Sequence, residues 1–434
     1  MMNPSSDNWK KRTVLFMASQ AISLFGSSLV SYAILWRITL DTQSGFMMTL
    51  YLLFGFLPTF FLSPFAGVWA DRYNRKHLIM LSDGAIALAT LVLAALFLAG
   101  YRDLWLLFVI PVVRALGTAV QTPAANAFLP QIVPEDKLMK ANGLFTSTNS
   151  AIMLISPMAS GALLSFTSLE LILMIDVVTA LVAVIVLLGL KVPAQAGSKN
   201  HQDTKYWQDL SAGIRYIRNH DYLGRFFVYV TFLFFMVTPV AILTPLQVTR
   251  SFGGAIWRLT AMEVVFSVGM LAGGVLIANW GGFRNRVRTM AFSTLIIGIT
   301  TLLLGVVQNF WLYLGIMATI GVSLPLYNTP ATVLLQEKVE SGYLGRVFGV
   351  MGMISSGVMP VAMLAFGPLA DTVRIEWILV GTGLMLVVLA FALQVNKPLM
   401  KAGEPIRAKV GVEEELPADQ RLAACSAGQA DCQI

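Results

Sequence analysis

Long apolar runs, almost free of charged residues, recur about twelve times along this chain of 434 residues. Residues 87–100, ALATLVLAALFLAG, and residues 180–190, ALVAVIVLLGL, are two examples. An α-helix of roughly 20 residues crosses about 30 Å of hydrocarbon. In lipid, only a helix or a closed barrel satisfies all of its backbone hydrogen bonds. The runs therefore predict an all-α integral membrane protein with twelve transmembrane helices.

The predicted helices form two sets of six, separated by the longest internal polar stretch. The spans are 12–36, 46–70, 77–99, 104–127, 141–165 and 168–190, then 222–248, 258–279, 287–306, 310–332, 343–369 and 375–395. We expect a first bundle at 1–190, a cytoplasmic linker at 191–221, a second bundle at 222–396 and a disordered cytoplasmic tail at 397–434, which is rich in Glu, Ala and Gly.

The basic residues predict the orientation. Of the 30 Lys and Arg residues, 24 lie on one side of the membrane if both termini and the even-numbered connections share that side. The other side receives five: Arg37, Arg102, Arg250, Arg258 and Arg374. Because cytoplasmic connections are enriched in Lys and Arg, this distribution places both termini in the cytoplasm.

The composition excludes other classes of protein. A hydrophobic fraction of 56% would leave a soluble domain with large exposed apolar patches. The net charge of +7 is explained by the basic residues of the cytoplasmic connections, so we predict no nucleic-acid partner. The start, MMNPSSDNWKKR, is basic like a signal peptide. The apolar run that follows is too long and has no convincing cleavage site, so we expect it to remain as the first helix.

The linker contains a helical pattern of its own. Trp207, Leu210, Ile214 and Ile217 recur at spacings of three, four and three, which makes one apolar stripe. Such a helix can lie on the inner leaflet of the membrane. It can equally be a linker helix that packs on the protein, and the sequence does not separate the two positions.

An internal repeat relates the two halves. A shift of 207 residues superposes 67–76 on 274–283 and the tripeptide TPA at 122–124 on TPA at 329–331. A shift of 206 superposes Val133, Leu138, Gly143 and Gly161 on Val339, Leu344, Gly349 and Gly367. Parallel six-helix halves with a binding site between them are typical of transporters.

The stretch GVWADRYNRK, residues 67–76, concentrates charge in the turn between the second and third spans. Gly67 allows neighbouring backbones to approach closely, and Asn74 suits a left-handed turn. The basic residues Arg72, Arg75 and Lys76 resist entry into lipid. Asp71 suits a different role, because an acid at this position can accept N–H bonds from the start of another helix. We favour a latch between helices over a pure topology signal.

This stretch resembles the loop signature of the major facilitator superfamily. RALGTAVQTPAANAFLPQIVP (114–134), ISPMASG (155–161), GMLAGGVL (269–276) and LQEKVESGYLGRVFGVMG (335–352) extend the resemblance, which covers about residues 9–396. Together they look most like the macrolide-efflux branch, relatives of which also export siderophores and other amphiphiles.

The resemblance implies a proton-driven exporter in a bacterial inner membrane that works by alternating access. It implies a central cavity among spans 1, 4, 7 and 10. It also implies that Asp71 and its neighbours form an inner latch on the start of span 11, near residues 342–345. Ser156, Pro157, Ser160 and Gly161 resemble the antiporter motif of span 5, with serines in place of the usual glycines.

Polar stripes in those spans independently predict a cavity, because polar faces are costly against lipid. The cavity candidates are Gln20, Ser23 and Ser27, with Ser31 on the same face of span 1; Thr118 and Gln121 in span 4; Thr231, Phe235 and Thr238 in span 7; and Thr319, Ser323 and Tyr327 in span 10. A single buried serine is more often a packing residue, but four coincident stripes favour a water-accessible passage.

Ionisable residues inside the spans are candidates for proton coupling. Asp176 and Glu263 are the predicted proton acceptors, although an acid that merely holds helices together explains each equally well. Arg114 matches an arginine that the resemblance links to proton coupling. Asp41, at the outer end of span 1, is a weaker candidate, and we expect Asp83 to be a structural partner of the basic loop.

The sequence therefore favours an exporter of bulky amphiphilic compounds, macrolides first, by proton antiport. A siderophore or lysolipid is the alternative cargo, and a membrane scaffold or sensor that transports nothing is the alternative class. We expect no enzyme activity, cofactor or metal, because no nucleophile with a base and no metal-ligand cluster is recognisable. The expected partners are the substrate, protons and the lipid bilayer. We expect a monomer, and the resemblance leaves open an ABC-type ATPase partner.

Overall fold

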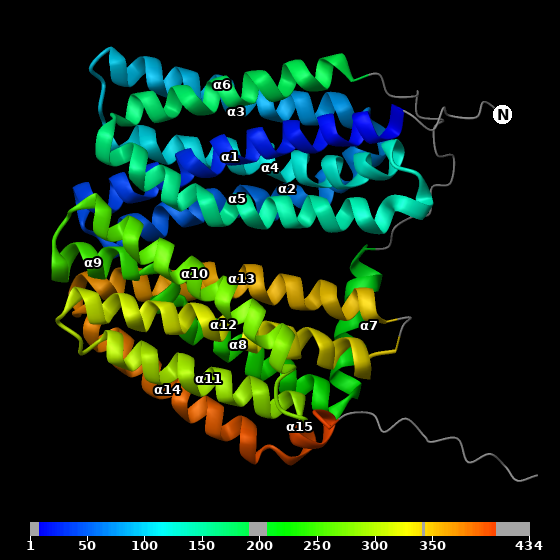
Figure 1. Ribbon diagram of the computed structural model, residues 1–434, viewed down its shortest axis with the longest axis vertical. Coiled ribbons are helices and arrows are strands. Elements are labelled where there is room, and N and C mark those ends of the chain that lie inside the picture. The colour runs from blue at the N-terminus through cyan, green and yellow to red at the C-terminus, as the bar shows by residue number, and fades with distance from the viewer. Residues whose placement is uncertain (1–7, 191–205, 341–342, 405–434) are drawn as a thin grey trace, which may run out of the picture.

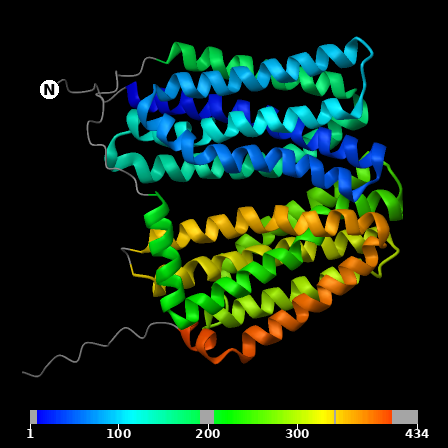
Figure 2. The same ribbon diagram turned by 180° about the vertical axis from the view of Figure 1, so that it is seen from behind.

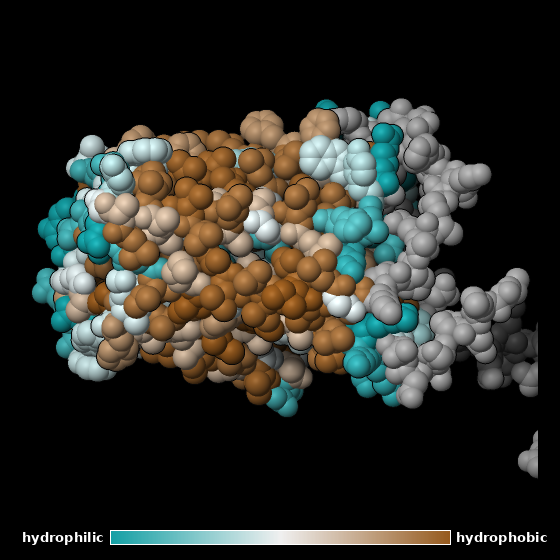
Figure 3. All heavy atoms as spheres, turned by 90° about the horizontal axis from the view of Figure 1, so that it is seen from above, coloured by the Kyte–Doolittle hydropathy of each residue, from teal (hydrophilic) through white to brown (hydrophobic). Residues whose placement is uncertain are grey.

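The computed structural model describes residues 8–190, 206–340 and 343–404 (Figure 1). Within these ranges the chain is nearly all helical, and 12 helices are long and apolar enough to cross a membrane. This confirms the predicted fold class. In Figure 3 a broad hydrophobic belt covers the middle of the molecule and hydrophilic residues gather at its two ends, as a bilayer requires.

Two groups of helices form two bundles. The first contains α1 (Asn8–Thr42), α2 (Gly45–Arg72), α3 (Arg75–Leu98), α4 (Leu104–Ile132), α5 (Leu138–Phe166) and α6 (Leu169–Gly189). The second contains α8 (Asp221–Ile242), α9 (Thr244–Phe252), α10 (Ile256–Trp280), α11 (Arg286–Leu304), α12 (Phe310–Lys338), α13 (Leu344–Thr372) and α14 (Ile375–Val395). A short turn of helix, η1 (Glu135–Lys137), precedes α5.

The two bundles repeat one packing scheme. In the first, α1 packs on α5 and α6, α2 packs on α4, and α3 packs on α4 and α6. The second bundle makes the corresponding contacts: α8 with α13 and α14, α10 with α12, and α11 with α12 and α14. This internal symmetry agrees with the repeat in the sequence. The first helix of each half thus lies beside its fifth and sixth helices.

Asparagine side chains begin several of the helices. Asn74 accepts hydrogen bonds from the backbone N–H groups of Lys76 and His77, and Asn285 caps α11 in the same way. The expectation of a left-handed Asn74 is wrong, because its φ of −64° and ψ of 113° are those of an ordinary N-cap residue. The turn after α2 therefore starts a helix by capping rather than through an unusual backbone conformation.

The seventh span consists of two helices. Pro239 and Pro245 lie on either side of Leu243, where α8 ends and α9 begins. Proline has no N–H to donate, so the helix is interrupted here. The side chain of Gln247 in α9 then donates to the carbonyl oxygen of Leu304 at 2.8 Å, which anchors α9 to the end of α11.

The linker helix α7 (Tyr206–Asn219) packs against α8 and α13. Tyr216 and Ile217 are buried, and the ring of Tyr216 stacks on that of Tyr343 with centroids 4.3 Å apart. Ile214 is exposed, while the side chains of residues 206–210 lie outside the described part of the chain. The second half of α7 therefore packs on the protein.

A short helix, α15 (Lys397–Ala402), follows the last span, so the expectation of disorder from residue 397 is wrong at its start. Asn396 caps this helix, Pro398 lies in its first turn, and Leu399 is buried. The Asn285 side chain also donates to the carbonyl oxygen of Met400 at 2.7 Å, which ties α15 to the start of α11. Residues 405–434 lie outside the described part of the chain.

The two ends of the molecule carry different elements and are named accordingly. The amino-terminal face is the end where α1 begins and where α7 lies (Figure 1). The opposite face carries the α1–α2 connection, α9 and the α13–α14 connection.

Adjacent glycines on α10 provide a test of the packing. A Cβ at Gly273 would collide with the carbonyl oxygen of Val322 in α12, whereas a Cβ at Gly274 would meet nothing within 4 Å. We expect Gly273→Ala to cost about 1–3 kcal/mol because the helices must move apart. In detergent, Gly273→Ala should unfold at a temperature several degrees below that of the wild type. Gly274→Ala should unfold at the same temperature as the wild type. Equal melting temperatures for the two variants would contradict this packing.

Candidate functional site

The bundles meet at the opposite face, where α2 contacts α13 and α5 contacts α10. A Cβ at Gly45 would collide with the carbonyl oxygen of Gly367, and one at Gly367 would collide with the Thr49 side chain. Across the other pair of helices, a Cβ at Gly161 would collide with Thr260. Glycine is needed at these positions because the backbones of the two bundles approach so closely.

An acid on α13 caps the start of α2 at this contact. The Asp371 carboxylate accepts hydrogen bonds from the backbone N–H groups of Gly45 at 2.8 Å and Phe46 at 3.0 Å, and from the Ser44 hydroxyl at 2.7 Å. A helix N-terminus favours negative charge, so this arrangement holds the last turn of α13 against the first turn of α2.

Arg250 of α9 completes the closure. Its Nη2 lies 3.0 Å from Oδ1 of Asp371, and its Nη1 donates to the carbonyl oxygen of Ala370 at 2.6 Å. The same guanidinium also donates to the carbonyl oxygen of Gln43, in the α1–α2 connection of the first bundle. We call these contacts of Asp371 and Arg250 the outer closure.

The sequence also contains a signal for the outer closure, which we did not predict. The pattern G-x-x-A-D occurs at residues 67–71, GVWAD, and again at residues 367–371, GPLAD. The first copy ends α2 at the amino-terminal face and the second ends α13 at the opposite face. The two acids thus occupy corresponding places on the two helices that contact each other.

At the amino-terminal face, the same helices show no comparable closeness. A Cβ at Gly67 of α2, at Gly143 of α5 or at Gly349 of α13 would meet nothing within 4 Å. Viewed from behind in Figure 2, the blue α2 and the yellow-orange α13 lie nearest each other at the end that carries α9. Among the described residues, the close contacts between the bundles therefore lie at the opposite face and not at the amino-terminal face.

The predicted inner latch stays a prediction. The Asp71 side chain and residues 341–342 lie outside the described part of the chain. Arg72 is exposed. Arg75 donates to the carbonyl oxygens of Ala70 and Ala127, and Lys76 to those of Leu188 and Leu190. These contacts of Arg75 and Lys76 tie together α2, α3, α4 and the end of α6 within the first bundle.

A cavity of about 630 Å³ lies between the bundles. The first bundle contributes polar side chains to its lining, namely Ser27, Ser28, Ser31, Thr59, Arg114 and Thr118, together with Tyr32 and Tyr51. The second bundle contributes Ile242 from α8 and Ser355, Ser356, Met359, Pro360 and Met363 from α13. The first bundle also supplies apolar lining residues, namely Leu24, Leu52, Phe56, Ile86, Pro111, Ala115 and Met153. The cavity is therefore mostly apolar, and most of its hydroxyl groups and its guanidinium come from the first bundle.

The predicted cavity residues divide into three groups. Ser27 and Thr118 line the cavity as expected. Gln20, Ser23 and Gln121 do not line it and lie within or beside the interior of the first bundle. The candidates of the second bundle also do not line it: Thr231, Phe235, Thr238, Thr319, Ser323 and Tyr327.

The second-bundle candidates stay predictions, and several of them make local contacts of the kind that small polar residues also satisfy. The hydroxyls of Thr231, Thr238 and Ser323 donate to carbonyl oxygens one turn earlier in their own helices. Ser355 and Ser356 of α13 are the lining residues that sequence reasoning missed. These two serines are adjacent and have glycines around them, so they do not recur at the spacings of three and four residues that mark a polar helical stripe.

An ion pair lies behind the side of the cavity that the first bundle lines. Arg114 Nη1 lies 2.7 Å from Oδ2 of Asp176, and both side chains are buried. The hydroxyls of Thr90 and Ser27 also donate to the Asp176 carboxylate, at 3.1 and 3.4 Å. The structure thus joins two predicted coupling residues, and through Ser27 and Arg114 it connects them to the cavity.

Asp83 is buried in the same bundle, which differs from our expectation. Its Oδ1 accepts hydrogen bonds from the Ser23 hydroxyl and the Gln121 amide, each at 2.7 Å. It therefore joins α3 to α1 and α4 in the bundle interior. The expectation that it serves the basic loop is wrong because Asp83 lies about two turns further along α3, on the face that packs inward.

The two remaining acidic candidates occupy different environments. Asp41 is exposed and forms an ion pair with Arg37 at 2.6 Å on the surface of α1. Glu263 lies in the outer part of α10, the helix whose Thr260 faces Gly161 of α5. Glu263 thus lies near the seam between the bundles, one turn after the Thr260 contact.

The antiporter-like motif of α5 also contributes to the seam. Ser160 donates to the carbonyl oxygen of Leu29 in α1 at 3.0 Å, and Gly161 faces Thr260 and Trp36. Ser156 is fully buried, and Pro157 lies inside the helix. This part of α5 therefore packs between α1 and α10.

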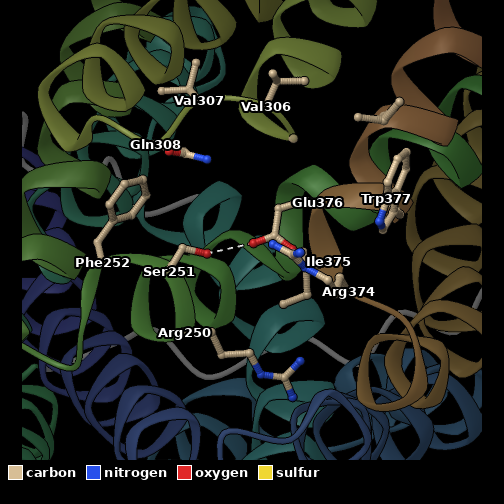
Figure 4. A pocket seen from close by; sticks show the side chains of 12 residues that line it. Arg250, Ser251, Phe252, Val306, Val307, Gln308, Arg374, Ile375, Glu376 and Trp377 are labelled. Carbon is tan, nitrogen blue, oxygen red and sulfur yellow. Dashed lines mark hydrogen bonds and ion pairs between the residues drawn. The ribbon is translucent and has the colours of Figure 1, made fainter.

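A hollow of about 820 Å³ lies beside the outer closure (Figure 4). It is lined by α9, the α11–α12 connection and the start of α14 within the second bundle. Ser251 donates to Glu376 across it at 2.9 Å, while Arg250 extends away from it. Because it does not lie between the bundles, we assign the candidate site to the central cavity. Within the described ranges, no group of three or more His, Cys, Asp or Glu residues could hold a metal ion.

Two symmetry-related bundles around a partly polar cavity, with close contacts between the bundles at one face among the described residues, define the class of secondary transporters. Comparison with known proteins gives the family. The chain belongs to the Major Facilitator Superfamily, whose family model matches residues 16–363.

Individual relatives agree with this assignment. The chain is 31% identical over 396 residues to "Macrolide efflux protein A" of Streptococcus pyogenes, which covers 90% of this chain and 97% of that protein. It is 22% identical over 397 residues to "Lysophospholipid transporter LplT" of Citrobacter koseri, covering 86% and 92%. Among solved structures, a bacterial homologue of the human lysosomal transporter Spinster has a TM-score of 0.67 at 15% identity, covering 93% of this chain and all of that one.

The outer closure can be tested by removing one charge. Asp371→Asn keeps the side-chain shape but weakens the contacts to Arg250 and to the start of α2, which we expect to cost about 1–2 kcal/mol. In a transporter whose bundles exchange between this arrangement and one that is open at the opposite face, the ratio of the two populations should then shift about tenfold toward the second.

The measurement uses a cysteine at Ser356, in a chain whose Cys425 and Cys432 are replaced by serine. A membrane-impermeant maleimide applied to the opposite face should label this cysteine faster in Asp371→Asn. Glu376→Gln is the matched control, because this acid lies at the same face but bonds to Ser251 within the second bundle. Equal labelling rates in both variants would rule out the outer closure as a determinant of state.

Proposed function

We propose that this chain exports bulky amphiphilic compounds, macrolide antibiotics first, in exchange for protons. The observation that carries the proposal is the cavity between the bundles, which the outer closure seals at the opposite face. The relative named macrolide efflux protein A supports this cargo, since nearly its whole length aligns with this chain.

We assign the amino-terminal face to the cytoplasm of a bacterial inner membrane, with both termini inside. The 24 Lys and Arg residues on that side support this orientation. In this orientation, the described structure is the inward-open state, in which a cavity accepts cargo from the cytoplasm.

The cavity suits a large ligand with mixed polarity. Pockets for drug-sized molecules have volumes of roughly 300–1,000 Å³ and are mostly apolar with a few polar groups. A cavity of about 630 Å³ with a mostly apolar lining and hydroxyl groups that lie chiefly on the side of the first bundle fits such a molecule. A macrolide matches this lining because it carries sugar hydroxyls on one part and a methylated ring on another.

Alternating access follows from the two copies of the G-x-x-A-D pattern. In the inward-open state, Asp371 caps α2 at the opposite face. In the outward-open state, Asp71 would cap the start of α13 at the amino-terminal face, while the outer closure separates. Each acid then stabilises one state of the same pair of helices, and cargo is exposed to one side at a time.

Proton coupling is assigned to the buried ionisable cluster of the first bundle. Arg114 lines the cavity and is paired with Asp176, so bound cargo and the charge of the cluster can influence each other. Glu263, near the seam between the bundles, is the second candidate for proton coupling.

A lysophospholipid is the alternative cargo. The relative named lysophospholipid transporter supports it, and a mostly apolar lining with hydroxyl groups chiefly on one side would also suit an acyl chain and a headgroup. The scaffold alternative, which transports nothing, predicts that no ligand moves. An ABC-type ATPase partner and a monomeric state remain proposals from the resemblance.

The test is transport in liposomes of phosphatidylethanolamine and phosphatidylglycerol with an acidic lumen. We expect radiolabelled erythromycin to accumulate, a protonophore to abolish the accumulation, and excess unlabelled erythromycin to compete. Competition by lysophosphatidylethanolamine but not by erythromycin would favour the alternative cargo. No proton-dependent movement of either compound would refute the proposed function.

Arg114→Leu should lower this uptake at least about tenfold, because it leaves the Asp176 carboxylate buried without its partner. Arg102→Leu is the matched control, since Arg102 is an exposed arginine of the same bundle whose partner is Glu170. Gel filtration should show both variants to be monodisperse. Wild-type uptake by Arg114→Leu would remove this residue from the mechanism.

A further inference from the structure

The first bundle buries two acids of this site in different surroundings. Asp176 accepts hydrogen bonds from Arg114, Thr90 and Ser27, so both of its oxygens have donors and one donor is a cation. Asp83 has only neutral donors, and both bind Oδ1. Its Oδ2 is buried and has no hydrogen-bond partner in the described structure.

The charges of this cluster do not balance without a proton. Among the described residues of the first bundle, Arg114 is the one basic residue with a buried side chain. Asp83 and Asp176 accept hydrogen bonds from Ser23 and Ser27, which lie one turn apart on α1, so the two acids belong to one cluster. With both acids ionised, two negative charges face one positive charge, and burial of an uncompensated charge is costly. One bound proton makes the cluster neutral.

The geometry indicates which oxygen takes that proton. Asp176 shares a direct ion pair with Arg114 at 2.7 Å, and this contact favours its ionised form. Asp83 has no such counterion, and Oδ1 already accepts two hydrogen bonds. A proton on Oδ2 would neutralise the acid without disturbing either bond. We propose that Asp83 binds and releases the transported proton, while the Arg114–Asp176 pair stays ionised.

Other charged groups around α3 do not provide this counterion. Among the described residues, helix α3 packs mainly against α4 and α6, whose buried charged residues are Arg114, Asp176 and Glu170. Glu170 is itself an acid and is paired with Arg102 at the opposite face, so it offers no positive charge to Asp83. Helix α1 contributes the neutral hydroxyl of Ser23, which donates to Asp83. Helix α2 makes only slight contact with α3. The basic residues at the start of α3 lie about two turns away and donate to backbone carbonyl oxygens. Asp83 is therefore held by neutral groups.

The donors of Asp83 also link it to the cavity. Ser23 lies one turn from Ser27 on α1, and Gln121 lies one turn from Thr118 on α4, and both of these neighbours line the cavity. Cargo that moves α1 or α4 would change the hydrogen bonds that reach Asp83. Water admitted by such a movement would accept the proton from Oδ2 and stabilise the carboxylate left behind.

This inference rests on the proposed proton antiport and deepens it. Purified protein in weakly buffered detergent is mixed with erythromycin, and proton release is followed with a pH indicator while binding is measured in parallel. Wild-type protein should release protons on binding. Asp83→Asn should bind erythromycin within about threefold of the wild type yet release none, because an amide holds no exchangeable acid proton in this pH range. Asp83→Glu should restore the release.

Liposomes provide the second measurement. Asp83→Asn should retain exchange of labelled for unlabelled erythromycin, which needs no net proton movement, and should lose accumulation driven by a pH gradient by at least about tenfold. Glu170→Gln is the control, because this acid of α6 is paired with the exposed Arg102 at the opposite face. It should behave as the wild type in both measurements.

The outcomes separate the two proposals. Wild-type protein without proton release or gradient-driven uptake refutes proton antiport itself. Normal release and accumulation by Asp83→Asn refutes only the role of Asp83. If Asp83→Asn fails to fold, Ser23→Ala provides the test, since it removes one donor to the ionised carboxylate and should move the pH profile of proton release upward. An unchanged profile would then overturn the inference.

Discussion

The structure depends on a contact between the last turn of one helix and the first turn of another. Asp371 of α13 accepts hydrogen bonds from the N-terminus of α2, and Arg250 holds the same carboxylate from α9. Gly45 and Gly367 allow the backbones to meet beside this cap, and Gly161 allows the second close approach, between α5 and α10. Because the described residues join the bundles closely at this face, the space between the bundles becomes a cavity that is closed there.

The two bundles share a packing scheme but differ in chemistry. The first contains Arg114, Asp176 and Asp83 in its interior and gives the cavity most of its hydroxyl groups. The second contributes a largely apolar wall and supplies Arg250 and Asp371 to the outer closure. The charged cluster is confined to one bundle, so rigid rocking of the bundles would change its access to water without breaking the Arg114–Asp176 pair.

The sequence was sufficient for the membrane fold, because lipid imposes a length and an apolar content on every span. It also pointed to Arg114 and Asp176 separately, since ionisable residues in hydrocarbon are rare. It could not pair them, because they lie 62 residues apart and only the packing of α3 against both α4 and α6 brings them together.

Cavity residues were harder to predict. A stripe of small polar residues can line a passage, donate hydrogen bonds to carbonyl oxygens of its own helix, or bind another helix. Thr238 and Ser323 satisfy their own helices, while Ser355 and Ser356 reach the cavity without forming a stripe.

The cavity wall has a consequence for the breadth of cargo. Methionines 153, 359 and 363 and the prolines 111 and 360 form much of its apolar part. Unbranched thioether side chains adapt their rotamers to irregular surfaces, so surfaces rich in them tolerate varied partners. A wall of this kind sorts molecules by bulk and by the position of their polar groups rather than by a fixed outline. If the chain exports amphiphilic compounds as proposed, such a lining would let chemically unrelated scaffolds share one route through the protein.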